Sequence, residues 1–267
     1  MVRNMHILLF LLALFAGPAR ADAPCGIDQP CTIEDRGYFL RLPDGWDGQS
    51  ELPVLLHFHG WGRQGDVVTG HDRIASATRK RGVLLVAPNG RNRTWSFWRP
   101  GSADTAFAEA VLADVAARYP IDRARIYVSG YSYGSAMAWR FACETDVPLA
   151  ALLAIAGTLR QDEDCPSAPR SVRHVHGLDD TVMEFPMGAG GDQTRPVALW
   201  RQALDCGDVT PVGAWQARSF LTLTRLEWQD CTAGQVALDI HPGGHFIPHG
   251  WIARHLDELL GLPFSYP

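Results

Sequence analysis

The sequence predicts an α/β fold in which a mainly parallel sheet carries helices on both faces. Continuously apolar segments alternate with amphipathic ones along the chain, which is the pattern of buried parallel strands connected by helices. Clusters of glycine, proline, asparagine and aspartate separate these segments, as turns require. The 267 residues are 46% hydrophobic, enough for one substantial core, so we expect a single domain over residues 22–267.

The expected elements follow one another in strand and helix order. Strands are expected over residues 38–42, 54–59, 83–87, 126–128, 149–155, 172–176, 220–228 and 236–240. Helices are expected over residues 72–80, 105–119, 136–142, 197–204 and 251–260. Ser102 or Asp104 can cap the second of these helices, and Pro120 ends it. The segment 157–170 is too short for a large helical cap, so we expect an open site.

The first 21 residues have the features of a secretory signal peptide. Arg3 gives a positive start, residues 7–16 are an unbroken apolar run, and Ala19-Arg20-Ala21 offers small residues for cleavage. The apolar run is shorter than the roughly 20 residues that a membrane anchor needs. We therefore expect export to the periplasm or the medium, with cleavage near Ala21.

Charge and cysteine content fit an exported protein. Cleavage would remove Arg3 and Arg20 and no acidic residue, which changes the formal net charge from −5 to −7. An acidic chain disfavours nucleic acid and anionic membranes as partners. The spacing of the six cysteines suggests three sequential disulfides, although 15 connectivities are possible. The suggested pairs are Cys25 with Cys31, Cys143 with Cys165, and Cys206 with Cys231.

The strongest chemical signal is Gly130-Tyr131-Ser132-Tyr133-Gly134, which lies between an expected strand and an expected helix. In the α/β-hydrolase fold a nucleophilic serine projects from a tight turn at this place, and the flanking glycines relieve its close contacts. The motif therefore predicts the α/β-hydrolase fold, with Ser132 as nucleophile. An ordinary glycine-rich turn is the alternative.

A serine hydroxyl needs a histidine as base and a carboxylate that orients the histidine, and in this fold the chain order is serine, acid, histidine. The loop after strand 172–176 carries Asp179 and Asp180. We expect Asp180 to be the acid, partly because of a resemblance described below, and Asp179 is the alternative. His245 follows Gly243-Gly244 beyond the last expected strand, so we expect it to be the base.

The other late histidines fit the role of the base less well. His241 ends a strand, and His249 and His255 approach or lie on the last helix, where we expect surface positions. A metal site made of His241, His245 and His249 is disfavoured, because the intervening prolines prevent the helix on which that spacing converges. His57 and His59 are expected to be hydrogen-bonded at a strand end. We expect no metal and no cofactor.

The tetrahedral intermediate of ester hydrolysis carries an oxyanion, which needs two backbone N–H donors. Tyr133, directly after the nucleophile, and Trp61, in the glycine-rich loop after strand 54–59, are the expected donors. Trp95, Trp98 and Tyr131 fall in loops expected near the nucleophile, where aromatic surface would bind substrate. The alternative is that these aromatic residues pack beneath the loops.

Five blocks of residues together resemble those of secreted polyhydroxybutyrate depolymerases and feruloyl esterases. The blocks are His59-Gly60-Trp61-Gly62, Pro88-Asn89-Gly90 followed by Trp95, the motif around Ser132, His176-Gly177-Leu178-Asp179-Asp180, and Gly243-Gly244-His245. The resemblance extends from about residue 37 to the C-terminus. It implies that Asp180 is the acid and His245 the base. The chain departs from the pattern at Trp61, where depolymerases often have cysteine, and at Phe246-Ile247-Pro248, where Thr-Trp-Pro is frequent.

These observations favour a secreted serine esterase that cleaves carboxylic esters, of a polyhydroxyalkanoate or of the feruloyl type, through an acyl-enzyme. The ester substrate can be polymeric. A serine peptidase of the prolyl-oligopeptidase type uses the same order of catalytic residues and is one alternative. A catalytically silent binding protein on the hydrolase fold is the other.

Overall fold

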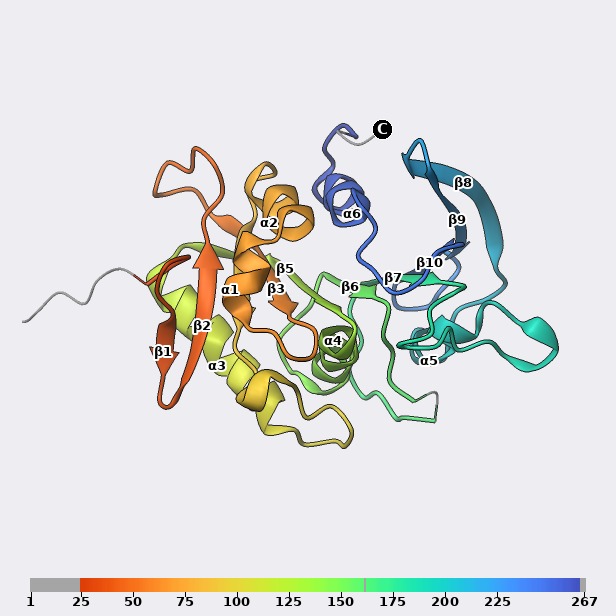
Figure 1. Cartoon of the computed structure of the whole chain (residues 1–267), viewed down its shortest axis with the longest axis horizontal. Coiled ribbons are helices and arrows are strands. Elements are labelled where there is room, and N and C mark those ends of the chain that lie inside the picture. Colours follow the sequence, from red (N-terminus) through yellow and green to blue (C-terminus); the bar gives the residue numbers. More distant parts are fainter. Residues whose placement is uncertain (1–24, 161, 265–267) are drawn as a thin grey trace, which may run out of the picture.

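The computed structural model describes residues 25–160 and 162–264, so the expected signal peptide lies outside the described residues. The strands are β1 (Cys31–Ile33), β2 (Arg36–Arg41), β3 (Leu52–Phe58), β4 (Leu84–Pro88), β5 (Ile121–Tyr131), β6 (Ala151–Ile155), β7 (Ser171–Gly177), β8 (Thr210–Arg218), β9 (Leu221–Trp228) and β10 (Gln235–His241). Within the described ranges they form a 10-stranded sheet of order β1-β2-β4-β3-β5-β6-β7-β10-β9-β8 (Figure 1).

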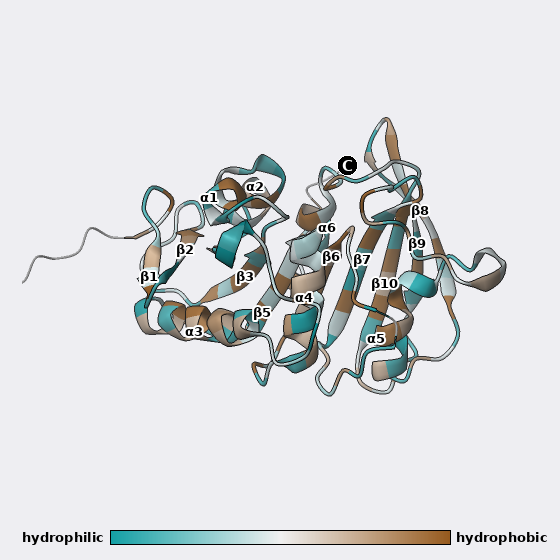
Figure 2. Ribbon diagram, turned by 60° about the horizontal axis from the view of Figure 1, so that its bottom comes forward, coloured by the Kyte–Doolittle hydropathy of each residue, from teal (hydrophilic) through white to brown (hydrophobic). Residues whose placement is uncertain are grey.

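The centre of the sheet is parallel. Strands β4, β3, β5, β6, β7 and β10 pair in parallel, and antiparallel strands extend the sheet at both edges. Every residue of β3, β4, β6 and β7 is buried, as expected for parallel strands covered on both faces. Figure 2 shows apolar residues along the central strands and hydrophilic residues in many of the surrounding loops.

Helices cover both faces of the sheet. They are α1 (Gly65–Gly70), α2 (Asp72–Arg79), α3 (Ala103–Arg118), α4 (Tyr133–Glu144), α5 (Ala198–Ala203) and α6 (Trp251–Leu260). One apolar cluster joins α3, α4 and α5 to the sheet, and a second joins α1, α2 and α6 to it. Figure 1 shows α2 and α6 on one side of the sheet and α3 and α4 on the other. The α/β-hydrolase architecture predicted from the sequence is therefore confirmed.

Most expected elements are present, with ends that differ by a few residues. Ser102, rather than Asp104, caps α3, because its hydroxyl oxygen accepts a hydrogen bond from the Asp104 amide at 3.2 Å. Strand β5 is longer than the predicted 126–128. The prediction missed its first half because that part is largely exposed and lacks an apolar pattern. Strands β1 and β8 and helix α1 were not predicted, nor were three short 3-10 turns: η1 (Arg91–Arg93), η2 (Ala189–Gly191) and η3 (Arg195–Val197).

A buried ionic cluster connects β9, β10 and α6. The two oxygens of Asp239 accept hydrogen bonds from Arg225 Nε and Nη2, at 2.8 and 2.9 Å. Trp251 Nε1, at the start of α6, donates to Asp239 Oδ2 at 2.8 Å, and His255 Nε2 lies 2.9 Å from the same oxygen. The expected surface position of His255 was wrong: the residue is fully buried, because it faces this carboxylate from the inner side of α6.

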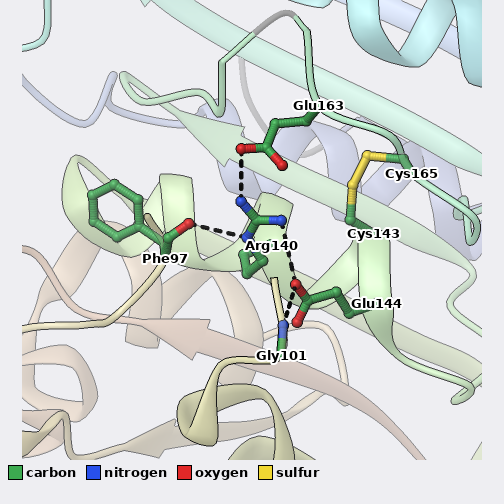
Figure 3. Close-up of a disulfide and its surroundings, with 7 residues drawn as sticks. All are labelled: Phe97, Gly101, Arg140, Cys143, Glu144, Glu163 and Cys165. Atoms are coloured by element: carbon green, nitrogen blue, oxygen red, sulfur yellow. Dashed lines mark hydrogen bonds and ion pairs between the residues drawn. A yellow bond between two sulfur atoms is a disulfide. The ribbon is translucent and has the colours of Figure 1, made fainter. Parts of the chain in front are cut away.

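The three predicted disulfides, Cys25–Cys31, Cys143–Cys165 and Cys206–Cys231, are all formed. Figure 3 shows Cys143 on α4 beside Arg140, whose guanidinium lies 2.9 Å from Glu163 and donates to the Phe97 carbonyl at 3.0 Å. The disulfide and Arg140 thus attach two loops to the helix that follows Ser132. In the part of the chain that the structure covers, no helix has the length and apolarity to cross a membrane.

Candidate active site

Ser132 lies at the sharp turn between β5 and α4. Its backbone has φ 58° and ψ −124°, a conformation that costs free energy in any residue with a Cβ atom. The turn is fixed on one side by the Ser132 amide, which donates to the Ile155 carbonyl of β6 at 2.9 Å. Strained backbone held in this way is typical of a functional position.

The two glycines of the motif have no room for a side chain. A Cβ on Gly130 would lie 2.1 Å from the carbonyl oxygen of Gly134, and one on Gly134 would lie 2.0 Å from the carbonyl oxygen of Phe58. Because both obstacles are backbone atoms, neither can move aside without displacing β3 or α4. The glycines therefore let the turn pack directly against the neighbouring strand.

Asp180 lies in the loop that follows β7 and is buried, whereas Asp179 is exposed. Its Oδ1 accepts hydrogen bonds from the amides of Val182 and Met183, both at 2.9 Å, and its Oδ2 lies 2.7 Å from His245 Nδ1. Burial alone would raise the pKa of Asp180, but these hydrogen bonds, with that of His245 the largest, outweigh it and hold the pKa below its usual value. Asp180 is therefore an ionised acceptor.

His245 lies in the loop between β10 and α6. Gly177 permits this loop to lie against the end of β7, since a Cβ on Gly177 would lie 2.0 Å from the Gly243 carbonyl oxygen. The ring of Tyr131 packs on the His245 ring with centroids 4.8 Å apart, and the Tyr131 hydroxyl donates to the His245 carbonyl at 3.0 Å. Because Asp180 accepts the proton of Nδ1, the lone pair of Nε2 is left available.

Ser132 and His245 line the same cavity, which has a volume of about 690 Å³. Its other lining residues are His57, His59, Gly60, Trp61, Arg63, Val67, Val68, His71, Arg73, Ile74, Tyr131, Val182, Phe246 and Ile247. Among the described residues, the Ser132 hydroxyl and the His245 ring share no hydrogen bond. Such bonds are often long in free enzymes and shorten when substrate binds.

The backbone amides of Trp61 and Tyr133, the predicted donors, have no hydrogen-bond partner among residues 25–160 and 162–264. Tyr133 is the first residue of α4, where N–H groups lack partners within the helix. Gly60 lies against the nucleophile, because a Cβ on it would be 3.8 Å from Ser132 Cβ. The Gly60–Trp61 peptide therefore passes beside Ser132.

His59 fixes that peptide, and its hydrogen bonds define its tautomer. Its Nε2 accepts from the Gly90 amide at 3.0 Å, so its Nδ1 carries the proton and donates to the Gly60 carbonyl at 2.8 Å. The carbonyl and N–H of a trans peptide point in opposite directions, so the Trp61 N–H points away from His59. Burial lowers the pKa of His59 to about 4, so the ring is neutral at pH 7. The expected strand-end role of His59 is confirmed.

The predicted aromatic residues lie in three different environments. Trp95 is 2% exposed, does not line the cavity, and donates from Nε1 to the His59 carbonyl at 2.8 Å. The structure therefore favours the alternative for Trp95, in which it packs beneath the loop. Tyr131 and Trp61 line the cavity, and Trp61 is 70% exposed. Trp98 is 64% exposed and packs edge-on against Tyr133, with ring centroids 5.7 Å apart.

His176 is a further residue beside Asp180 that the sequence did not indicate as functional. Its Nε2 donates to the Met183 carbonyl at 2.6 Å and lies 3.3 Å from Asp180 Oδ2. It thus contacts the loop that carries Asp180 at two points. The regular alternation of His174 and His176 within a strand gives no local sign of this contact. No group of side chains that could hold a metal ion occurs among the residues described.

Comparisons with known proteins agree with this geometry. A family model described as phospholipase/carboxylesterase matches residues 102–196. The chain is 26% identical over 219 residues to a probable feruloyl esterase C of Aspergillus terreus, covering 80% of this chain and 77% of that protein. It is 30% identical over 170 residues to feruloyl esterase C of Emericella nidulans, covering 61% of this chain and 60% of the relative. The solved acetyl xylan esterase from Aspergillus awamori superposes with a TM-score of 0.61 at 13% identity, covering 84% and 94% of the two chains.

The parallel sheet, the strained turn between β5 and α4, and the structural similarity define an α/β-hydrolase. The family match and the relatives define its reaction class: the protein is a carboxylic ester hydrolase.

Proposed function

We propose that the protein is a serine esterase with Ser132 as nucleophile, His245 as general base and Asp180 as the carboxylate that orients the histidine. The observation that carries this proposal is the 2.7 Å contact between Asp180 Oδ2 and His245 Nδ1, beside a cavity that Ser132 also lines. This contact directs Nε2 of His245, rather than Nδ1, toward the reaction.

In the first half of the reaction, His245 Nε2 takes the proton of Ser132 as Oγ attacks the ester carbonyl carbon. The carbonyl oxygen becomes an oxyanion, which the amides of Trp61 and Tyr133 stabilise. When the intermediate collapses, the carbon–oxygen bond to the alcohol breaks and His245 returns the proton to the alcohol. Water then attacks the acyl-enzyme by the same route and releases the acid.

The test is replacement of Ser132 by alanine. Because the hydroxyl forms the covalent bond, Ser132→Ala should lower kcat/KM for a nitrophenyl ester by roughly four orders of magnitude, with an unchanged circular dichroism spectrum. The wild type should also be labelled by a fluorophosphonate, and the variant should not. Labelling of the variant, or of neither protein, would contradict the proposal, and the second result would favour a catalytically silent scaffold.

We further infer that the natural ester belongs to a phenolic acid and is attached to a polymer. The similarity to feruloyl esterases supports the acid, and the exposed indoles of Trp61 and Trp98 support a broad substrate. A panel of methyl ferulate, hydroxybutyrate oligomers, acetylated xylan and nitrophenyl acetate tests this inference. A clear preference for the oligomers would favour a polyhydroxybutyrate depolymerase instead.

We also propose that the protein is exported and loses its first 21 residues. Three disulfides suit an oxidising compartment. Mass spectrometry of the exported protein should find an N-terminus near Asp22, and an intact Met1 would contradict the proposal.

A further inference from the structure

The cavity beside Ser132 is lined by both apolar and polar side chains. Val68, Ile74 and Ile247 contribute apolar wall surface. His57 lies at the end of β3, also lines the cavity, and is only 1% exposed. A polar side chain that is buried this deeply is costly unless its hydrogen-bonding groups find partners.

One nitrogen of His57 has a partner, and the other does not. Nδ1 lies 3.1 Å from Ser129 Oγ on the adjacent strand β5. Nε2 forms no hydrogen bond within the described part of the chain. Burial, and then the neighbouring His71 and His59, lower the pKa of His57 to about 3, so the ring is neutral at pH 7. A neutral imidazole suits a hydroxyl, which can donate or accept, and offers no charge to a carboxylate.

The depth of His57 indicates the length of the group that would reach it. His57 pairs with Ser129 of β5, three residues before Ser132, which lies just beyond the end of that strand. At about 3.3 Å per strand residue, the backbone level with His57 on β5 lies at most roughly 10 Å from that of Ser132. The para-hydroxyl of an aryl-propenoyl group lies roughly 8 Å from its carbonyl carbon, by ordinary bond lengths. An acetyl group on Ser132 would end far short of His57.

We propose that His57 determines acyl specificity, by forming a hydrogen bond with a hydroxyl at the far end of an aryl-propenoyl group attached to Ser132. The proposal rests on the proposed function, because Ser132 must carry the acyl group. It adds a residue that recognises the acyl group at the opposite end from the reacting carbonyl.

The experiment compares methyl para-hydroxycinnamate with methyl cinnamate, which differ only in the hydroxyl. The wild type should prefer the hydroxylated ester in kcat/KM by roughly 10- to 100-fold, the effect of one buried hydrogen bond. His57→Leu should reduce this ratio to near one, and His57→Gln should retain part of it, because the amide can still donate and accept. His249→Leu is the matched control: it removes an imidazole outside this cavity and should keep the wild-type ratio.

A wild-type ratio near one, or an unchanged ratio in His57→Leu, would overturn the proposal. If His57→Leu does not fold, two other measurements test the proposal. The ratio in His57→Gln should fall below the wild-type ratio. The kcat/KM of the wild type should also fall for the para-methoxy ester, because methylation removes the hydroxyl donor. If neither cinnamate reacts while nitrophenyl acetate is cleaved in a Ser132-dependent way, the specificity proposal is wrong and the proposed function stands. If Ser132→Ala still cleaves nitrophenyl acetate, the proposed function itself is wrong.

Discussion

The geometry around Ser132 depends on how closely backbone atoms approach one another. Gly134 contacts the carbonyl groups of Phe58 and His59 at the end of β3, and this contact sets the distance between Ser132 and the Gly60–Trp61 peptide. A glycine in this position therefore shapes the candidate site without supplying any reacting group.

Gly134→Ala should disturb both stability and activity. The added Cβ would lie 2.0 Å from the Phe58 oxygen and 2.5 Å from the His59 oxygen, so α4 must move away from β3. We expect a loss of about 1 to 3 kcal/mol in the free energy of unfolding and a lower kcat/KM. Urea denaturation and assays with a nitrophenyl ester measure the two effects. Gly70→Ala is the control, because a Cβ there meets no atom within 4 Å, and equal effects of the two substitutions would contradict the argument.

Sequence reasoning led to candidate site residues that stand in ordered motifs. The glycines around Ser132 and before His245, and the required order of serine, acid and histidine, led to three residues of which the structure joins Asp180 and His245 directly. It did not predict the contact of His176 with Asp180 or the position of His57 in the cavity, since both are ordinary members of buried strands. Their contacts depend on which strands are neighbours, and the sequence does not state the strand order.

At the scale of elements, the loop that carries His245 is held at both ends by one carboxylate. Asp239 lies two residues before the end of β10, and Trp251 and His255 bind it from α6. The loop between β10 and α6 therefore starts and ends at a rigid ionic cluster. Arg73 of α2 adds a third attachment by donating to the carbonyl of Ile247.

Asp239→Asn should strongly destabilise the fold at neutral pH. The substitution removes the buried carboxylate that binds Arg225 Nε and Nη2, and leaves that guanidinium its ion pairs with Glu258 and Glu227. Breaking a buried ion pair in this way costs about 3 to 5 kcal/mol in the free energy of unfolding. Chemical denaturation at pH 7 measures this loss. Asp162→Asn breaks an exposed ion pair with Arg160 instead and should leave the stability near the wild-type value.

The same ionic cluster predicts how the free energy of unfolding depends on pH. Burial alone would raise the pKa of Asp239, but hydrogen bonds from His255 and Arg225 outweigh it and hold the pKa well below that of the unfolded chain. The resulting stabilisation is complete above about pH 4 and is lost as the pH falls toward the folded-state value. The free energy of unfolding of the wild type should therefore fall steeply below pH 4, and less steeply in Asp239→Asn. An equal pH dependence of the free energy of unfolding in the two proteins would show that another titrating group determines it.

Elements with a strong apolar pattern were predicted well, and those without one were missed. Strand β8 is mostly exposed, so its sequence lacks the alternation that marks a half-buried strand. Helix α1 has only six residues and begins and ends with glycine, which gives a weak helical signal. Both are stabilised by their neighbours in the fold rather than by local preference.

At the scale of the whole molecule, one disulfide attaches a long loop to a core helix. The Cys143–Cys165 bond and the Arg140–Glu163 ion pair attach the segment after β6 to α4 (Figure 3). The sequence predicted this pairing because the cysteines are consecutive, but it could not predict the ion pair beside it. That contact appears only when α4 and the loop are packed together.

Removal of Cys143–Cys165 should cost more stability than removal of Cys25–Cys31. The two bonds close loops with sequence separations of 22 and 6 residues, so chain entropy predicts losses of about 3 and about 2 kcal/mol. Paired cysteine-to-alanine variants, compared by urea denaturation, measure the difference. A larger loss from the shorter loop would show that native contacts, rather than loop closure, determine the effect.

The order of the cysteines also bears on how the oxidised chain is reached. Each of the three bonds joins a cysteine to the next one along the polypeptide. A chain that crosses a membrane from its N-terminus exposes its thiols one after another, so each cysteine meets its native partner before any other thiol arrives. Simple oxidation in order of emergence then gives the native set, and no wrongly formed bond has to be exchanged.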